Sequence, residues 1–347
     1  MRRAAEIAAQ VFTARDALLR DTPEDLRVAF LLFDSAVETL LVRRTQHDVN
    51  EWRFDMWPVM EEYGVPVVSV DLHDFGQRVR EQEDKGAAVL LRLSSTQKKD
   101  IARDFDTKLR LLVWLGTIPA DYIPVLSRLH AYRNELYHRE ESRPKTLQTV
   151  THLYAWLVAD LLERLPPAWV AHSSADPDDL PTRIYERIGI PVPQGEVTSA
   201  GRGLQALMAT ALRDGLRLDG VPALLADYVE SRMEDLHQRL TYIGEMFAKP
   251  SDEKPLTPMQ IIRLLYAEEW PEDLRQAPAR GVPVTKAKLD EWCTWHARIR
   301  EFTDPVGAFH SLAQFETEFE PVERKVIDMV IDIDTFIQRQ IDIMRGK

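Results

Sequence analysis

Helical periodicity runs through most of this 347-residue chain and leaves few fold classes open. Apolar residues recur at steps of three and four over long segments, as in Val322, Val326, Met329, Val330 and Ile333 near the C-terminus. Hydrophobic residues make up 45% of the sequence, which is enough to build a buried core. The pattern therefore predicts an all-α fold.

One segment divides the helical pattern into two parts. Residues 168–198 are rich in Pro, Asp, Ser and Gly and lack sustained periodicity, which is typical of a linker. We therefore expect a helical bundle over residues 1–167 and a second helical domain over residues 199–347. The pattern also weakens at about residues 52–93, which predicts an insertion in the first domain.

Local signals place several helix ends. Thr22 and Pro23 predict a helix start, and Ser94 predicts another, whose apolar stripe continues until Gly116 stops it. Within the insertion, the two apolar runs at residues 65–70 and 87–91 are compatible with short strands and equally with irregular backbone.

Charge and cysteine usage exclude several classes of protein. The chain has 44 basic and 56 acidic residues, a net charge of −12, which argues against coating nucleic acid through bulk charge. The single cysteine, Cys293, excludes an internal disulfide and a Cys-based zinc site. No apolar run approaches the ~20 residues of a membrane span, and the first residues lack a signal-peptide pattern, so we expect a cytoplasmic protein without a membrane partner.

The segment from Leu129 to Arg139 stands apart from the rest of the chain. On a helical wheel, Arg133 lies about 40° from Leu129, inside the apolar face of the helix. A guanidinium in that position needs an anionic or hydrogen-bonding partner. Two interpretations stay open: an intramolecular acid such as Asp34 or Glu38, or a phosphate held at a helix–helix seam.

The same segment resembles the signature of the HEPN superfamily of nucleases. Arg133-Asn134, three further residues and then His138 match the family pattern of Arg, a polar residue, three variable residues and His. The flanking segment 104–119 and the earlier helix at residues 33–41 are also similar to the family. The resemblance covers roughly residues 20–165.

The resemblance implies a compact helical bundle that forms a homodimer and cuts RNA without a metal or cofactor. His138 would act as general acid or base, and Arg133 would hold the scissile phosphate. Asn134 would position either His138 or the phosphate. The product would be a 2′,3′-cyclic phosphate. Four further residues are implied to support the site or bind substrate: Asp34, Glu38, Tyr137 and Arg139.

The resemblance also implies a biological role. Stand-alone members commonly act as toxins or defence effectors, so we expect RNA as substrate, with tRNA as one example, and an antitoxin or regulatory protein as a partner. Glu140 replaces the tyrosine of the extended family motif, so control by tyrosine modification is not implied. The alternative is a non-catalytic HEPN-type module that binds a protein or nucleotide.

Three features of the second domain invite functional interpretations. Arg232 and His237 repeat the Arg-x4-His spacing; we interpret them as solvated helix residues, with a degenerate second HEPN motif as the alternative. The segment 292–296, which holds two tryptophans and Cys293, is expected to pack in the core. Three aspartates are expected on the polar face of the last helix: Asp328, Asp332 and Asp334.

Overall fold

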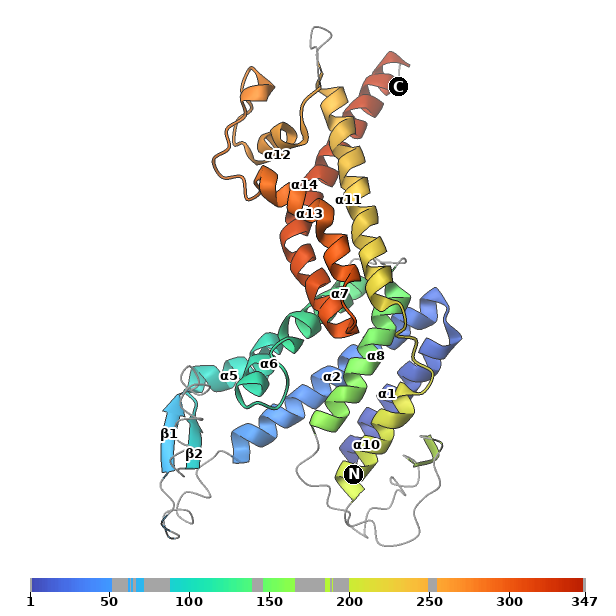
Figure 1. The fold of residues 1–347 in the computed structure, drawn as a ribbon, viewed down its shortest axis with the longest axis vertical. Helices are drawn as coiled ribbons and strands as arrows, with labels where there is room; N and C mark the ends of the chain where they lie inside the picture. The colour runs from blue at the N-terminus through green and yellow to red at the C-terminus, as the bar shows by residue number, and fades with distance from the viewer. Residues whose placement is uncertain are drawn as a thin grey trace. The chain divides into compact units, whose positions relative to one another are not determined.

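The computed structural model divides into two compact units, residues 1–219 and residues 220–347 (Figure 1). It describes residues 2–51, 62, 64, 67–71, 88–138, 146–165, 185–187, 189, 200–248 and 255–345. The elements of the described residues are helices apart from one pair of short strands, which confirms the all-α class.

The first unit is a helical bundle with a small sheet. Its elements are α1 (Arg2–Arg20), α2 (Pro23–Glu51), β1 (Val67–Asp71), β2 (Ala88–Arg92), α5 (Ser95–Arg103), α6 (Phe105–Trp114), α7 (Tyr122–His138), α8 (Leu147–Arg164) and α10 (Ala200–Arg213). The helix α2 packs against α1, α5, α6, α7 and α8, so it forms the centre of the bundle.

Local signals placed several of these elements correctly. Thr22 accepts a hydrogen bond from the backbone N–H of Asp25 at the start of α2. Ser94 and Gln97 form a capping box at the start of α5, and Gly116 has a φ of 67° after α6. These three confirmed ends depend on contacts within a few residues.

One expectation in this unit is corrected, and one helix was not predicted. The stripe from Ser94 to Gly116 is not one helix, because it breaks at Asp104, which ends α5 and caps α6 by accepting from Thr107 N–H at 2.7 Å. The helix α1, which no sequence signal indicated, buries Val11 and Phe12 and packs along α2.

The insertion contains the two strands that the sequence left undecided. The strands β1 and β2 pair in parallel, from Val67 opposite Ala88 to Asp71 opposite Arg92. Residues 67–70 and 88–91 of the two apolar runs therefore form β-structure, whereas the other residues of the runs and most of the remaining insertion lie outside the described residues.

The helix α10 belongs to the first unit, although its sequence position suggested the second domain. It packs on α8 and α1. The guanidinium of Arg213 donates to both carboxylate oxygens of Glu163 on α8, at 2.6 and 2.8 Å, and Arg15 of α1 donates to the carbonyl of Ala211. Most of the expected linker at residues 168–198 lies outside the described residues.

The second unit is built around three helices with an aromatic core. Its elements are α11 (Val221–Met246), α12 (Pro258–Tyr266), the 3₁₀ turn η2 (Leu274–Gln276), α13 (Lys286–Arg300) and α14 (Pro305–Met344). Trp292 of α13 packs edge-on against Phe315 and Phe319 of α14. Burial of such rings is the main source of stability in a bundle of this size.

Candidate functional site

The carboxylate of Asp34 is fully buried in the first unit and contacts hydrogen-bond donors on two other helices. The hydroxyl of Tyr154, on α8, donates to its Oδ1 at 2.7 Å. His130 Nδ1 and Arg133 Nε, both on α7, lie 3.0 and 3.4 Å from its two oxygens. A buried carboxylate is tolerated only with such partners, so this cluster fixes α7 against α2 and α8.

The imidazole of His130 is held on two sides. Its ring stacks on Phe105 of α6, with ring centroids 4.2 Å apart. Because a carboxylate only accepts hydrogen bonds, Nδ1 carries the hydrogen that faces Asp34. Burial lowers the pKa of His130, but the hydrogen bond and charge of Asp34, aided by Glu38, outweigh it, so the pKa is raised above 6.5.

Arg133 has the intramolecular partner that the helical wheel required. Of the two acids considered from the sequence, Asp34 forms the ion pair with its Nε. Its Nη1 donates to Asn134 Oδ1 at 2.9 Å, and 31% of its side chain stays exposed. Arg133 is therefore anchored to the bundle at its Nε, and its side chain is still open to solvent in part.

The remaining predicted site residues are placed only in part. Glu38 is half-buried one turn after Asp34 on α2. Tyr137 and His138 form the last turn of α7, but their side chains, and the whole of Arg139, lie outside the described residues. The distance between the Arg133 and His138 side chains therefore stays a prediction from sequence.

Two residues of the cluster were missed from the sequence. Neither His130 nor Tyr154 had a predicted role in the site. The spacing of His130 and Arg133, three residues apart on one helix, was the available signal. Tyr154 had no local signal, because its role depends on packing against α2.

An open groove of about 580 Å³ lies beside this cluster. Its lining comes from α1, α2, α5 and α6. The polar and charged members are Glu6, Ser35, Glu38, Thr39, Arg43, Gln46, Arg103 and Lys108, and the others are Val42, Ala102 and Phe105. Such a volume lies within the range of small-molecule sites in proteins.

Arg232, in the second Arg-x4-His segment, is not a solvated residue as expected. Its side chain is only 11% exposed. It lies 2.8 Å from Glu316 and 3.7 Å from Glu320, and it also pairs with Glu323. The correction has a simple cause: α11 and α14 pack together, and that packing carries Arg232 into a cluster of acids on α14. His237 is exposed, as expected.

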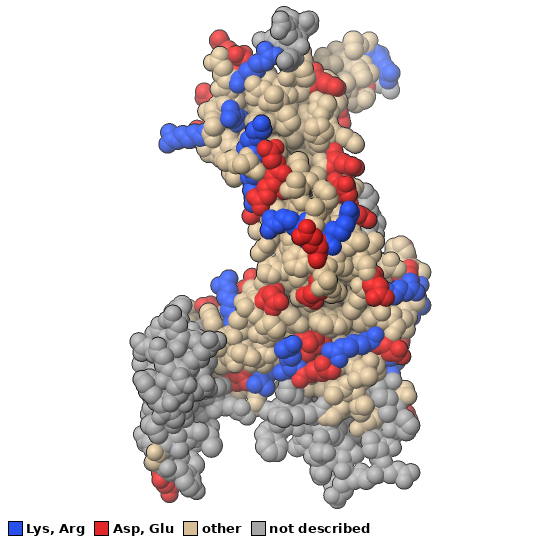
Figure 2. Space-filling view, viewed as in Figure 1, with Lys and Arg blue, Asp and Glu red and all other residues tan. Residues whose placement is uncertain are grey.

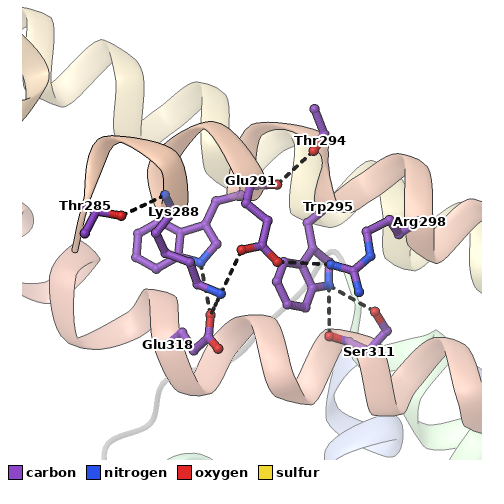
Figure 3. Close-up of polar contacts among 9 residues, drawn as sticks. Thr285, Lys288, Glu291, Thr294, Trp295, Arg298, Ser311 and Glu318 are labelled. Carbon is purple, nitrogen blue, oxygen red and sulfur yellow. Dashed lines mark hydrogen bonds and ion pairs between the residues drawn. The ribbon is translucent and has the colours of Figure 1, made fainter. Parts of the chain in front are cut away.

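The two tryptophans of the α13 segment pack in the core, as expected, whereas Cys293 between them is exposed, which corrects the expectation for that residue (Figure 3). Trp292 and Trp295 are 1% and 4% exposed. The indole N–H of Trp295 donates to the backbone oxygen and the hydroxyl of Ser311, and Lys288 bridges Glu291 and Glu318 at 3.0 and 2.6 Å. The aspartates of α14, Asp328, Asp332 and Asp334, are exposed, which confirms a polar face.

On the face drawn in Figure 2, the Lys and Arg side chains of both units are interspersed with Asp and Glu. Among the helices of the described residues, none combines the length and apolar character needed to cross a bilayer.

Comparison of the chain with protein-family models, with curated proteins and with solved structures finds no match. The resemblance to the HEPN superfamily therefore stays a prediction that depends on the motif residues themselves.

Proposed function

We propose that the protein is a metal-independent endoribonuclease of the HEPN type. The observation that carries the proposal is the state of Arg133: its Nε is anchored 3.4 Å from a buried carboxylate, while 31% of the side chain stays exposed on the motif helix. A guanidinium fixed at one edge loses little freedom when it binds an anion, so it suits the stabilisation of a phosphate.

The chemistry follows from the residues of the motif. The 2′-oxygen of a ribose attacks the adjacent phosphorus as its proton passes to the imidazole of one His138. Arg133 offsets the negative charge that builds on the phosphate oxygens. The bond from phosphorus to the 5′-oxygen breaks, a second His138 donates a proton to that oxygen, and the products are a 2′,3′-cyclic phosphate and a 5′-hydroxyl.

A homodimer supplies the second imidazole of this scheme. On a helix, Arg133 and His138 are separated by about 140° around the axis, which favours a site shared between two copies of α7. A two-fold arrangement lets the guanidinium of one protomer work beside the imidazole of the other.

The test is cleavage of tRNA and total RNA in EDTA. We expect cyclic-phosphate ends from the wild-type protein, a rate at least about 100-fold lower for His138→Ala and Arg133→Ala, and no cleavage of the corresponding DNA. His237→Ala is the matched control, because it removes an exposed histidine with the same spacing from an arginine. Equal rates for His138→Ala and the control would reject the proposal.

The biological proposal is a toxin or defence effector of the cytoplasm, held in check by an antitoxin or regulatory protein. If so, expression arrests growth, and His138→Ala relieves the arrest. The ion pair of Arg133 with Asp34 favours one alternative, a non-catalytic binding module in which Arg133 is structural. In that case Arg133→Ala lowers stability, and the folded wild-type protein cuts no RNA.

A further inference from the structure

The groove described above, which lies between α2 and the α5–α6 pair, carries cations that the Asp34 cluster does not use. Arg103, the last residue of α5, is exposed, and within the described part of the chain no acidic side chain pairs with it. Lys108 of α6 is 6% exposed and donates to the carbonyl of Asp104 at 3.2 Å, which leaves further ammonium hydrogens for a ligand.

The other wall of the groove, formed by α2, offers neutral and acidic hydrogen-bonding groups beside Arg43, which pairs with Glu6 of α1 at 3.8 Å. Glu38 and Thr39 are neighbours on α2, and Gln46 lies about two turns further along it. Carboxylate, amide and hydroxyl groups can pair with the edge of a nucleobase, whereas the cations opposite suit one phosphate. With two acids, Glu6 and Glu38, also in the lining, the groove fits a single phosphate group better than a polyphosphate.

The groove adjoins the Arg133 cluster. Phe105 lines the groove and stacks on His130, which is bonded to Asp34. Glu38 also lines the groove, and its charge acts on both Lys108 and His130. A ligand in the groove is therefore separated from the cluster by a single layer of side chains.

We propose that this groove binds one nucleotide, with its phosphate on Arg103 and Lys108 and its base edge on the α2 wall. Its position as the subsite next to the scissile phosphate rests on the proposed nuclease function, but the binding itself does not. The nucleotide has two possible sources, a free mononucleotide or one unit of an RNA strand.

Binding is tested with the full-length protein and a fluorescent oligoribonucleotide whose 2′-oxygens are methylated, which cannot be cut because the nucleophile is blocked. The variant is Arg103→Glu. The matched control is Arg110→Glu, which makes the same charge change at an exposed position of α6 outside the groove. We expect about tenfold weaker binding for Arg103→Glu and a change below about twofold for the control. Equal losses in the two variants would overturn the proposal, because they would reflect bulk charge alone.

Titration with the four 5′-mononucleotides separates the two sources. Saturable mononucleotide binding that Arg103→Glu abolishes assigns the groove to a free nucleotide, and binding of the oligonucleotide alone assigns it to RNA. Failure of both ligands to bind the wild-type protein overturns the inference. Because these ligands are not cut, the result is independent of cleavage. If RNA cleavage requires His138 but both variants bind the ligands equally, the groove proposal is rejected while the nuclease proposal stands.

Discussion

The hydroxyl of Tyr154 donates a 2.7 Å hydrogen bond to Oδ1 of Asp34, and neither side chain has any exposed surface. This bond joins α8 to α2 directly behind the motif helix α7. It also holds the carboxylate in place for the two donors on α7, so the position of Arg133 depends on a residue that never faces solvent.

Tyr154→Phe is expected to lower the free energy of unfolding of the first unit by about 1.5–3 kcal/mol, because the hydrogen bond to a buried carboxylate is lost. Tyr242→Phe is the matched control: Tyr242 donates to Asp334 at 2.6 Å on the surface, and the loss of that hydrogen bond should cost much less, because water replaces it. Denaturant titration, with hydrogen exchange of α8 peptides, measures both. Equal losses of unfolding free energy in the two variants would mean that the buried hydrogen bond to Asp34 stabilises the protein no more than a surface one.

Asp34→Asn is expected to be more damaging, at about 3–5 kcal/mol, because it leaves Arg133 and His130 without their anion in a partly buried site. The amide keeps nearly the same volume, so packing is not the cause. Thermal and denaturant unfolding measure the loss. A change below about 1 kcal/mol would show that water, rather than Asp34, satisfies the guanidinium.

The pKa of His130 makes the stability of the first unit depend on pH. Burial and the charge of Arg133 lower this pKa. The hydrogen bond and charge of Asp34, together with the charge of Glu38, outweigh them, so the pKa is raised above the 6.5 of a free histidine. A raised pKa means that the charged form stabilises the fold. The contribution is complete below the unfolded pKa and is lost as pH rises through the folded one.

The measurement is the difference in unfolding free energy between wild type and His130→Gln from about pH 6 to about pH 9. We expect the wild-type advantage to shrink as the pH increases. His237→Gln, which changes an exposed histidine, should leave the profile unaltered. An advantage that grows with pH would mean that the neutral imidazole is the stabilised form.

The parts of the fold that the sequence predicted are those governed by neighbouring residues. Pro23 and the Ser94–Gln97 box mark helix starts through contacts within one turn. The break at Asp104 was missed because apolar residues keep their helical spacing on both sides of it, and only the cap reveals the change of direction. The residues of α10 were expected in the second helical domain, because the packing of this helix on α8 depends on long-range contacts that no local pattern shows.

The candidate site shows the same division. The wheel predicted that Arg133 needs an anion, and Asp34 was one of two acids considered. His130 and Asp34 are 96 residues apart in the chain, and no local pattern links them. Arg232 shows the opposite error: a guanidinium on a charged helix looks solvated until α14 is packed against it.

Arg232 provides the last prediction, which separates a structural from a catalytic role for the second Arg-x4-His segment. Its guanidinium pairs with Glu316, which has no exposed surface, and lies 5.1 Å from the ring centroid of Phe319. Arg232→Met keeps most of the side-chain volume but leaves the buried acid without a cation. We expect a loss of about 3–5 kcal/mol in the second unit, seen in hydrogen exchange of α11 and α14 peptides.

Arg232→Lys should retain part of the stability, because it restores the charge without the planar geometry. RNA cleavage per folded molecule should be unchanged in both variants. A stable Arg232→Met protein with greatly reduced cleavage would instead identify Arg232 as part of a second catalytic motif.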